Sequence, residues 1–232
     1  MTRQCIEGTF DERALKVLAA VDKYRGPMPT GALMAINEHE SNFGENCYNT
    51  EAVDIKGVAN HAMGPWQIMG PSYLSDFGVN ATTVYDLDKS TKGVCKYRLV
   101  SHNSIVKLVP ELFNDQGGVS DLRTYSYLLY LSHFAGRGGM EKSIATARKT
   151  AAVTPERTPG YGHESGLLET ADRAAYWEQW AIEQRGVPVP FVPSPQWFPI
   201  LLGATMLATV GVAIYLHQTN QRPRWLPSWV PT

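Results

Sequence analysis

The chain has 232 residues, enough for one ordinary domain with an additional segment or for two small domains. Its 21 Lys and Arg residues balance 22 Asp and Glu residues, and the formal net charge of −1 argues against a protein held on nucleic acid by a strong positive field. The apolar fraction of 44% permits a packed core and argues against a disordered chain.

Two helical patterns open the chain. Thr9 and Glu12 form a capping-box pattern, and apolar residues then recur at helical spacing. Thr30 is expected to cap a second helix, which continues through Glu40 and stops at Gly44. Both helices belong to a region, residues 1–185, that carries nearly all the charges and is predicted to form one domain.

Helical patterns return in the second half of this domain. Further helices are predicted over residues 122–134, 140–152 and 168–184. The glycine-rich run 136–139 is interpreted as a turn that breaks the helical pattern. Convincing period-2 strands are scarce, and residues 45–65 and 91–109 are expected to hold a short hairpin or loops. The predicted fold class is a mainly α soluble domain with room for a small sheet.

The cysteines and histidines indicate neither a metal nor a cofactor. Three cysteines are too few for a disulfide framework, and nothing has the spacing of a zinc site. Two alternatives remain: three free buried thiols, or one disulfide, for which Cys47 with Cys95 is the favoured pair. Four histidines lack ligand spacing and are interpreted as structural or surface residues: His61, His102, His133 and His163.

The sequence changes character after residue 185. No Asp, Glu, Lys or Arg occurs between Gly186 and Gln221. Residues 186–197 contain four prolines, which is typical of an extended, semi-rigid linker. Residues 198–216 are apolar over about the 20-residue length that crosses a bilayer core. A transmembrane helix is therefore predicted there in preference to a buried core helix, followed by a short basic and aromatic tail, residues 217–232.

Glu40 stands out because it lies in register with an apolar helix face. Leu33, Ile36 and Glu40 are spaced i, i+3, i+7. Desolvation and the nearby helix C-terminus are both expected to raise the pKa of this carboxyl. A carboxylic acid that is protonated near neutral pH can serve as a general acid. The alternative is a glutamate in the last helical turn whose side chain reaches out to water.

Four segments resemble, in the same order, the motifs of the lytic transglycosylases, a goose-lysozyme-like family. The family's helix that ends in a Glu-Ser pair resembles residues 32–44, ALMAINEHESNFG. Its second motif resembles residues 63–79, MGPWQIMGPSYLSDFGV, and its third resembles residues 131–144, LSHFAGRGGMEKSI. Its closing helix resembles residues 168–180, LETADRAAYWEQW. The four segments extend over about 150 residues of the chain.

The resemblance implies a mainly α, lysozyme-like fold of the α+β type that binds peptidoglycan glycan strands. It implies cleavage of the β-1,4 bond between N-acetylmuramic acid and N-acetylglucosamine with formation of a 1,6-anhydro ring. Glu40 would match the single catalytic acid and base, and Tyr176 would reach back toward it. The substrate-binding positions implied by the resemblance are Ser41, Gly64, Gln67, Met69, Ala135, Gly136 and Tyr176.

The chain departs from the family at three places. His133-Phe134 stands where Tyr-Asn is usual, Pro65-Trp66 follows the second-motif glycine in place of the usual pair, and an insertion is expected around residues 50–60. Within that insertion Glu51 or Asp54 could hold a water molecule, in which case the domain would be a hydrolysing goose-type muramidase. A third alternative is a virion protein whose lysozyme-like domain binds glycan without cleaving it.

The flanks of the apolar segment suggest where the protein acts. Arg222 and Arg224 follow it, so the positive-inside rule places the tail in the cytoplasm and the large domain outside. Residues 1–11 contain no apolar secretory core. Delivery in a phage particle would reconcile these two observations. We therefore expect a single-pass, membrane-anchored virion component that opens the cell wall during genome entry in the host periplasm. Other virion proteins are possible partners, and a bacterial wall-remodelling enzyme or secretion-system component is the alternative.

Overall fold

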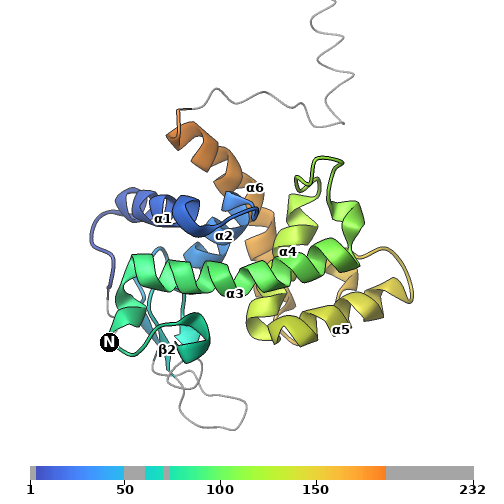
Figure 1. Cartoon of the computed structure of the whole chain (residues 1–232), viewed down its shortest axis with the longest axis horizontal. Helices are drawn as coiled ribbons and strands as arrows, with labels where there is room; N and C mark the ends of the chain where they lie inside the picture. The colour runs from blue at the N-terminus through green and yellow to red at the C-terminus, as the bar shows by residue number, and fades with distance from the viewer. Residues whose placement is uncertain (1–3, 50–60, 70–73, 187–232) are drawn as a thin grey trace, which may run out of the picture. The chain divides into compact units, whose positions relative to one another are not determined.

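The computed structural model describes residues 4–49, 61–69 and 74–186 (Figure 1). Six α-helices occur in this part of the chain: α1 (Phe10–Tyr24), α2 (Thr30–Ser41), α3 (Leu87–Leu108), α4 (Leu122–Phe134), α5 (Gly136–Arg148) and α6 (Glu164–Gln184). The prediction of a mainly α domain is confirmed. None of the described helices is long and apolar enough to cross a membrane. The predicted linker, the predicted transmembrane segment 198–216 and the tail lie outside the described residues.

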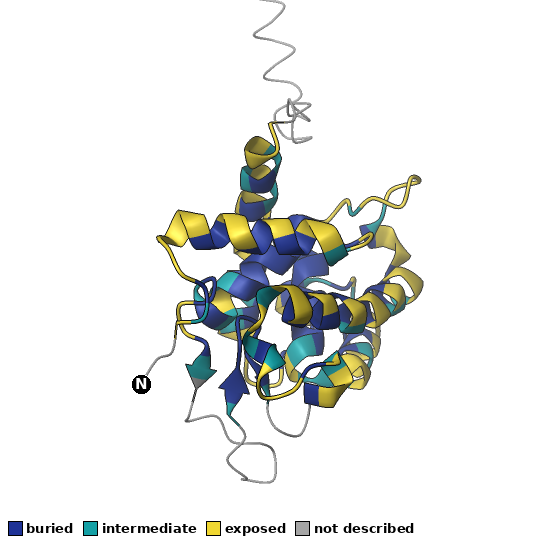
Figure 2. Cartoon of the chain, turned by 60° about the vertical axis from the view of Figure 1, so that its left-hand side comes forward, coloured by how far each residue is buried: buried dark blue, intermediate teal, exposed yellow. Residues whose placement is uncertain are grey.

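Two helices, α2 and α4, form the centre of the core. Residues 30–37 of α2 and residues 124–132 of α4 are all buried. A helix that is buried on every side belongs to the interior, whereas a surface helix buries one face only. Figure 2 shows this difference, since the outer helices carry exposed residues along one side and buried residues along the other. The C-terminal turns of α2 and α4 are therefore positioned by packing on several sides.

The N-terminus of α2 is stabilised by α6 and not by its own sequence. Thr30 was expected to be the cap, but the preceding Pro29 occupies that position and makes no side-chain hydrogen bond to the helix. The carboxylate of Glu178 on α6 accepts a hydrogen bond from the Gly31 amide instead. A Cβ atom on Gly31 would lie 2.2 Å from the Ala174 carbonyl oxygen, so only glycine permits this close approach of the two helices.

The helix boundaries follow the sequence best where a local signal exists. The capping box of Thr9 and Glu12 is present at the start of α1, and α4 has the predicted bounds. However, α5 begins at Gly136 and α6 at Glu164, each four residues before its predicted start. The interpretation of the glycine-rich run as a turn is therefore wrong, because the run lies inside α5, and only Ala135 separates α4 from α5, whose first residue Gly136 has φ of +65°.

The expectation of a hairpin or loops over residues 91–109 is wrong, because this segment belongs to α3. Asp86 caps the helix, since its side chain accepts a hydrogen bond from the Lys89 amide. Polar residues on its buried face obscure the helical pattern, but they have tertiary partners. Arg98 donates to the Leu129 carbonyl (3.0 Å), and His102 bonds the Tyr125 hydroxyl (2.9 Å).

A small antiparallel sheet, in the order β1-β2-β3, covers the end of α2. Its strands are β1 (Tyr48–Asn49), β2 (Ala62–Met63) and β3 (Ile68–Met69). The expectation of a hairpin in residues 45–65 is thus confirmed for β1 and β2. The turn from β2 to β3 begins at Gly64, where φ is +76° and a Cβ atom would lie 2.2 Å from the Val84 carbonyl oxygen. The expected insertion around residues 50–60 lies outside the described residues.

The favoured cysteine pairing is wrong, because Cys47 forms its disulfide with Cys5. The N-terminal segment runs beside the loop that follows α2, where the amides of Cys5 and Ile6 both donate to the Gly44 carbonyl. Cys95 lies on the buried face of α3 as a free thiol, and burial raises the pKa of this thiol to about 12. The disulfide therefore ties the N-terminal segment to the chain that leads from α2 into the sheet.

We predict that removing this disulfide in a Cys5→Ser, Cys47→Ser variant lowers the free energy of unfolding by about 2–4 kcal/mol, because the unfolded chain regains the freedom of a closed loop. Urea unfolding of the variant and of the unchanged protein, with and without reductant, measures this. Reductant should destabilise only the unchanged protein. A Cys95→Ala control should keep its sensitivity to reductant, and loss of that sensitivity would contradict the pairing.

Candidate active site

Glu40 lies in the last turn of α2, and its carboxylate is bonded on one oxygen by α4. The Tyr130 hydroxyl donates to Glu40 Oε1 over 2.7 Å, and His133 Nε2 lies 3.1 Å from the same oxygen. The side chains of Glu40 and His133 are 11% and 15% exposed. Within residues 4–49, 61–69 and 74–186, no hydrogen bond reaches Glu40 Oε2. Among the described residues, the carboxylate is thus held by one oxygen only.

The two neighbours of Glu40 come from one face of one helix. Tyr130 and His133 are three residues apart on α4, so their side chains lie on the same side of it. Tyr130 is fully buried, whereas His133 stands one turn nearer the surface. The packing of α4 beside α2 therefore places one hydroxyl and one imidazole at the carboxylate.

The electrostatic surroundings of Glu40 differ from those expected. Burial does raise the pKa of its carboxyl, as expected from its position on the apolar face. The charge and hydrogen bond of His133, the hydrogen bond from Tyr130 and the charge of Arg98 act in the opposite direction and together outweigh burial. The pKa of Glu40 is therefore lowered, and the expectation of a raised pKa is wrong. The free protein favours the ionised carboxylate.

Arg98 supplies a positive charge from the interior. Its side chain is only 2% exposed on α3, and its Nε has no hydrogen-bond partner among the described residues. Burial lowers the pKa of Arg98, and the negative charge of Glu40 acts against this. A buried charge is costly unless it is compensated, so Arg98 and the carboxylate stabilise one another in their ionised forms.

The two described acidic residues nearest to Glu40 in sequence have other partners. Glu38 forms an ion pair with Arg173 and accepts a hydrogen bond from the Trp177 indole over 2.7 Å. Glu45 lies 2.7 Å from Arg13 in a second ion pair. Both carboxylates are engaged by arginines of other helices, whereas that of Glu40 is bonded only to Tyr130 and His133 among the described side chains.

An exposed aromatic ring adjoins this cluster. Phe134 follows His133 at the end of α4 and is 40% exposed. Its ring stacks on the exposed His163 with centroids 4.4 Å apart and an interplanar angle of 11°. It also contacts Tyr130 edge-on, with centroids 4.8 Å apart. A partly exposed group of aromatic rings therefore lies close to the carboxylate.

Ser41, one of the substrate-binding positions implied by the resemblance, is buried and engaged within the protein. Its hydroxyl donates to the Pro65 carbonyl over 2.7 Å and accepts from the Gly44 amide over 2.9 Å. The side chain is 1% exposed. Ser41 therefore joins the C-terminus of α2 to the turn between β2 and β3, which positions Glu40 through the backbone.

The predicted residues of the second motif lie in that same turn. Gln67 is buried with φ of +46°, and its amide donates to the carbonyls of Asn46 and Gly64, each over 3.0 Å. Gly64 is also buried, and Met69 at the end of β3 is partly exposed. Gly64 and Gln67 therefore shape the sheet beside α2, and Met69 is the most accessible of the three.

The remaining predicted residues divide between the cluster and the surface. Ala135 and Gly136 directly follow the Glu40 neighbours on α4 and are partly exposed. Tyr176 on α6 is 57% exposed and packs against the Trp177 ring, and no hydrogen bond joins it to Glu40. The tyrosine that reaches Glu40 is Tyr130 on α4, whereas the turn of α6 that holds Tyr176 meets the end of α2 through Arg173 and Trp177, which bond Glu38.

Sequence reasoning missed three members of the cluster: Arg98, Tyr130 and His133. The interpretation of His133 as a structural or surface residue overlooked its bond to Glu40. The three-residue spacing of Tyr130 and His133 on a strongly predicted helix was the available signal. Arg98 lies in a segment whose sequence mixes polar and apolar residues, so its role could be recognised only once α3 was seen to pack beside α4.

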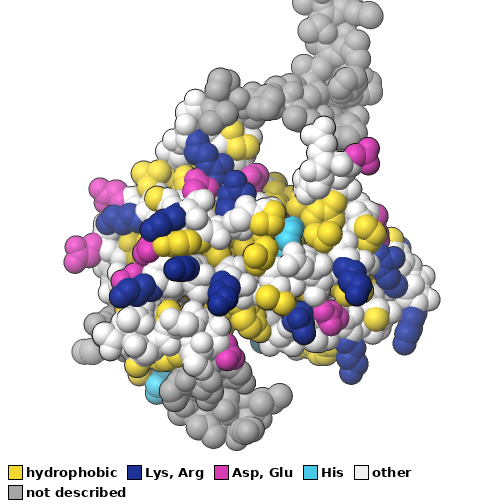
Figure 3. Space-filling model, viewed as in Figure 1, with side chains coloured by type: hydrophobic (Ala, Val, Ile, Leu, Met, Phe, Trp, Pro, Cys, Tyr) yellow, Lys and Arg dark blue, Asp and Glu magenta, His cyan; other side chains and the backbone are white. Residues whose placement is uncertain are grey.

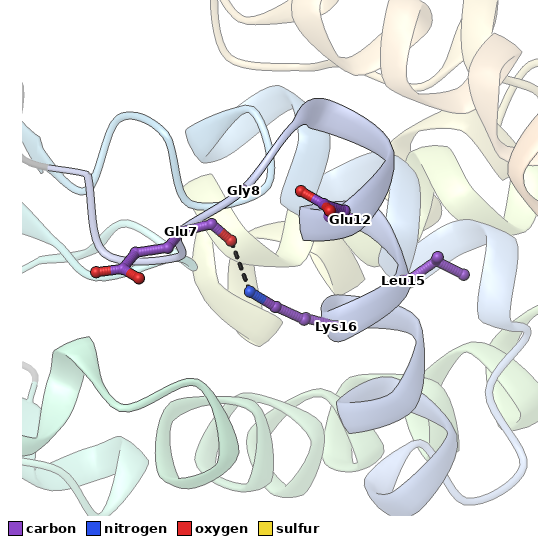
Figure 4. A pocket seen from close by; sticks show the side chains of 5 residues that line it. All are labelled: Glu7, Gly8, Glu12, Leu15 and Lys16. Carbon is purple, nitrogen blue, oxygen red and sulfur yellow. Dashed lines mark hydrogen bonds between the residues drawn. The ribbon is translucent and has the colours of Figure 1, made fainter.

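A separate hollow lies beside the start of α1 (Figure 4). It is lined by Glu7, Gly8, Glu12, Leu15 and Lys16. Lys16 Nζ donates to the Glu7 carbonyl over 2.6 Å, and the Glu12 carboxylate is bonded to the Thr9 amide in the capping box. These polar groups stabilise the N-terminus of α1, and none of the predicted site residues lines this hollow.

The surface charge is mixed on the face that Figure 3 shows. Lys and Arg side chains are spread across it, with acidic and hydrophobic side chains among them. Among the described residues there is no group of three or more His, Cys, Asp or Glu side chains arranged to hold a metal ion. Among the described residues, the Glu40 cluster is therefore the strongest candidate for an active site.

Comparison of the chain with protein families, with curated proteins and with solved structures finds no match.

We predict that Ser41→Ala lowers the free energy of unfolding by about 1–3 kcal/mol, because the buried Gly44 amide loses its acceptor. Urea unfolding measures the change. Ser165→Ala, at an exposed position of α6, is the matched control and should change stability by less than about 0.5 kcal/mol. Equal effects of the two substitutions would contradict the assigned role of Ser41.

Proposed function

We propose that the domain is a lysozyme-like, peptidoglycan-cleaving lytic transglycosylase in which Glu40 is the single acid and base. The observation that carries this proposal is the nearly buried carboxylate at the end of α2, bonded on Oε1 by Tyr130 and His133 and unbonded on Oε2 within the described residues. The four motif resemblances agree with this assignment. Glycan strands of the cell wall are the proposed substrate, and no cofactor takes part.

The proposed reaction uses one carboxyl group twice. Protonated Glu40 first donates its proton to the oxygen that links N-acetylmuramic acid to N-acetylglucosamine, and the glycosidic C–O bond breaks. The substrate's acetamido group helps to stabilise the resulting oxocarbenium-like or oxazolinium state. Glu40, now ionised, accepts the proton of the muramic acid 6-hydroxyl as that oxygen closes the 1,6-anhydro ring. The proton balance closes without water, and no second carboxylate is needed.

The surroundings of Glu40 support its role in the second half of this reaction. After it donates its proton, the carboxylate would be stabilised by the Tyr130 hydroxyl and by the charge of Arg98, which lower its pKa together with the larger effect of His133. Stabilisation of charge that develops during a reaction lowers the barrier when the donors are already in place. The groups that lower the pKa of Glu40 would thus stabilise the ionised carboxylate that forms during the reaction.

Two further observations favour a glycan substrate and a single carboxylate. The exposed Phe134 ring, stacked on His163, forms a partly apolar aromatic surface next to the acid, which suits contact with a sugar ring. The described carboxylates of Glu38 and Glu45 are engaged in ion pairs. Glu51 and Asp54, which would hold the water of a muramidase, lie outside the described residues.

We predict that the full chain releases anhydro-muropeptides from peptidoglycan, one water lighter than lysozyme products, as read by mass spectrometry. Glu40→Gln should lower the rate by at least about 10²–10⁴-fold, because an amide cannot exchange the proton. Glu45→Gln removes another carboxylate near the end of α2, one that is paired with Arg13, and serves as the matched control that keeps activity.

The other outcomes of this digest select other functions. Reducing-end products that depend on Glu40 would assign the domain as a goose-type muramidase. A folded protein that releases no product would indicate a virion protein that binds glycan without cleaving it. Full activity of Glu40→Gln would remove Glu40 from the mechanism.

We also propose that residues 198–216 anchor the protein in a lipid bilayer and that a phage particle delivers it to the host periplasm. The apolar length, the charge-free flank and the arginines that follow the segment support this assignment. We predict that the protein occurs in purified particles and stays with the membrane fraction after washing at high salt. Its absence from particles would contradict the proposed delivery, and release by salt would contradict the anchor.

A further inference from the structure

A general acid must carry a proton when its substrate arrives, yet the surroundings of Glu40 favour the ionised carboxylate. The imidazole of His133 lies within hydrogen-bond distance of that carboxylate, with Nε2 3.1 Å from Oε1. Imidazole is the side chain whose charge ordinarily changes between pH 5 and 8. The proton that Glu40 requires therefore has a donor in direct contact with it.

We propose that His133 is a positioning residue that stores the proton for Glu40. The pair holds one proton, which rests on His133 Nε2 in the free protein and passes to the Glu40 carboxyl when a glycan strand covers the pair. This inference rests on the proposed function and deepens it, because it assigns to the chain's own His133 a part in that reaction.

Covering the pair drives the transfer because the removal of water disfavours ions more than neutral groups. The free pair consists of an imidazolium and a carboxylate, and the covered pair of a neutral imidazole and a carboxylic acid, so its net charge does not change. The Nε2–H bond breaks and an Oε1–H bond forms. Rotation about the last side-chain torsion of Glu40, which has a broad range, then turns the proton toward the substrate.

The same pair regains its proton within one turnover. When Glu40 protonates the leaving oxygen, the pair is left with a neutral imidazole and a carboxylate. The proton of the 6-hydroxyl then returns to Glu40, and departure of the product exposes the pair to water, which restores the imidazolium and the carboxylate. The cycle consumes no proton and needs no other acid.

Other ionisable groups face this pair from each of the helices around it. They are His39 on α2, Arg98 on α3, Tyr130 on α4 and Glu169 on α6. Arg98 and Tyr130 both favour the carboxylate form of Glu40. His39 contacts the Tyr130 ring and lies beside Gly166 of α6, and Glu169 acts on Tyr130. Without His133, the proton of the pair would have to stay on the carboxyl alone, and a carboxyl ordinarily loses its proton at a lower pH than an imidazole.

The pH dependence of kcat/KM for glycan cleavage by the full chain tests this inference. The active pair carries one proton, so activity falls at high pH where the pair loses it. In His133→Gln the amide can still donate to Glu40 but cannot release a proton. We therefore expect the alkaline limb to move to lower pH by at least about one unit. A merely structural role would lower the rate without moving the limb.

His39→Asn is the matched control, because it removes a neighbouring histidine that does not contact Glu40. Its alkaline limb should stay in place. A limb that stays in place in His133→Gln, or moves equally in both variants, would overturn the inference while Glu40-dependent cleavage still supports the proposed function.

A second measurement needs no activity. In the full chain with ¹⁵N-labelled histidine, NMR should show that the pH dependence of the His133 Nε2 signal changes in Glu40→Gln, because the carboxylate 3.1 Å away is the proposed partner in the shared proton. An unchanged titration would overturn the shared proton even if the domain cleaves glycan. If Glu40→Gln proves fully active, the proposed function fails, and this titration still decides whether the two residues are coupled.

Discussion

The constraint on which the structure depends is the placement of a carboxylate at the end of a helix that is buried on almost every side. Such a group is costly to ionise unless partners compensate it. Tyr130 and His133 bond one oxygen of Glu40, and Arg98 adds a positive charge from the interior. These partners outweigh the cost of burial, so that a group on an apolar face remains ionised.

The rest of the described fold keeps these partners in place. Close packing of α6 on α2, made possible by Gly31, supplies the cap that the start of α2 lacks. At its other end, Ser41 joins α2 to the small sheet, and the disulfide between Cys5 and Cys47 holds the adjoining chain. Because α2 and α4 are both central, a change in their packing would alter the distance between the carboxylate and its partners.

The accuracy of the sequence predictions depends on how local the determining signal is. The capping box of α1 and the bounds of α4 follow from residues within a turn or from a continuous apolar run. The prediction failed over residues 91–109, where the buried face of α3 includes Arg98 and His102. Their partners, the Leu129 carbonyl and the Tyr125 hydroxyl, come from α4, so no local pattern could show that these polar residues are compatible with burial.

By itself the sequence determined that the domain is mainly helical and that Glu40 lies on an apolar helix face, because both properties follow from periodicities of a few residues. The tertiary structure alone decided which groups meet that carboxylate. Tyr130 is 90 residues away from Glu40 along the chain and Arg98 lies on a third helix. The tertiary structure also decided that the pKa of Glu40 is lowered and that Cys47 pairs with Cys5. Electrostatic effects and disulfide bonds depend on distances in space, and these exist only once the helices have packed.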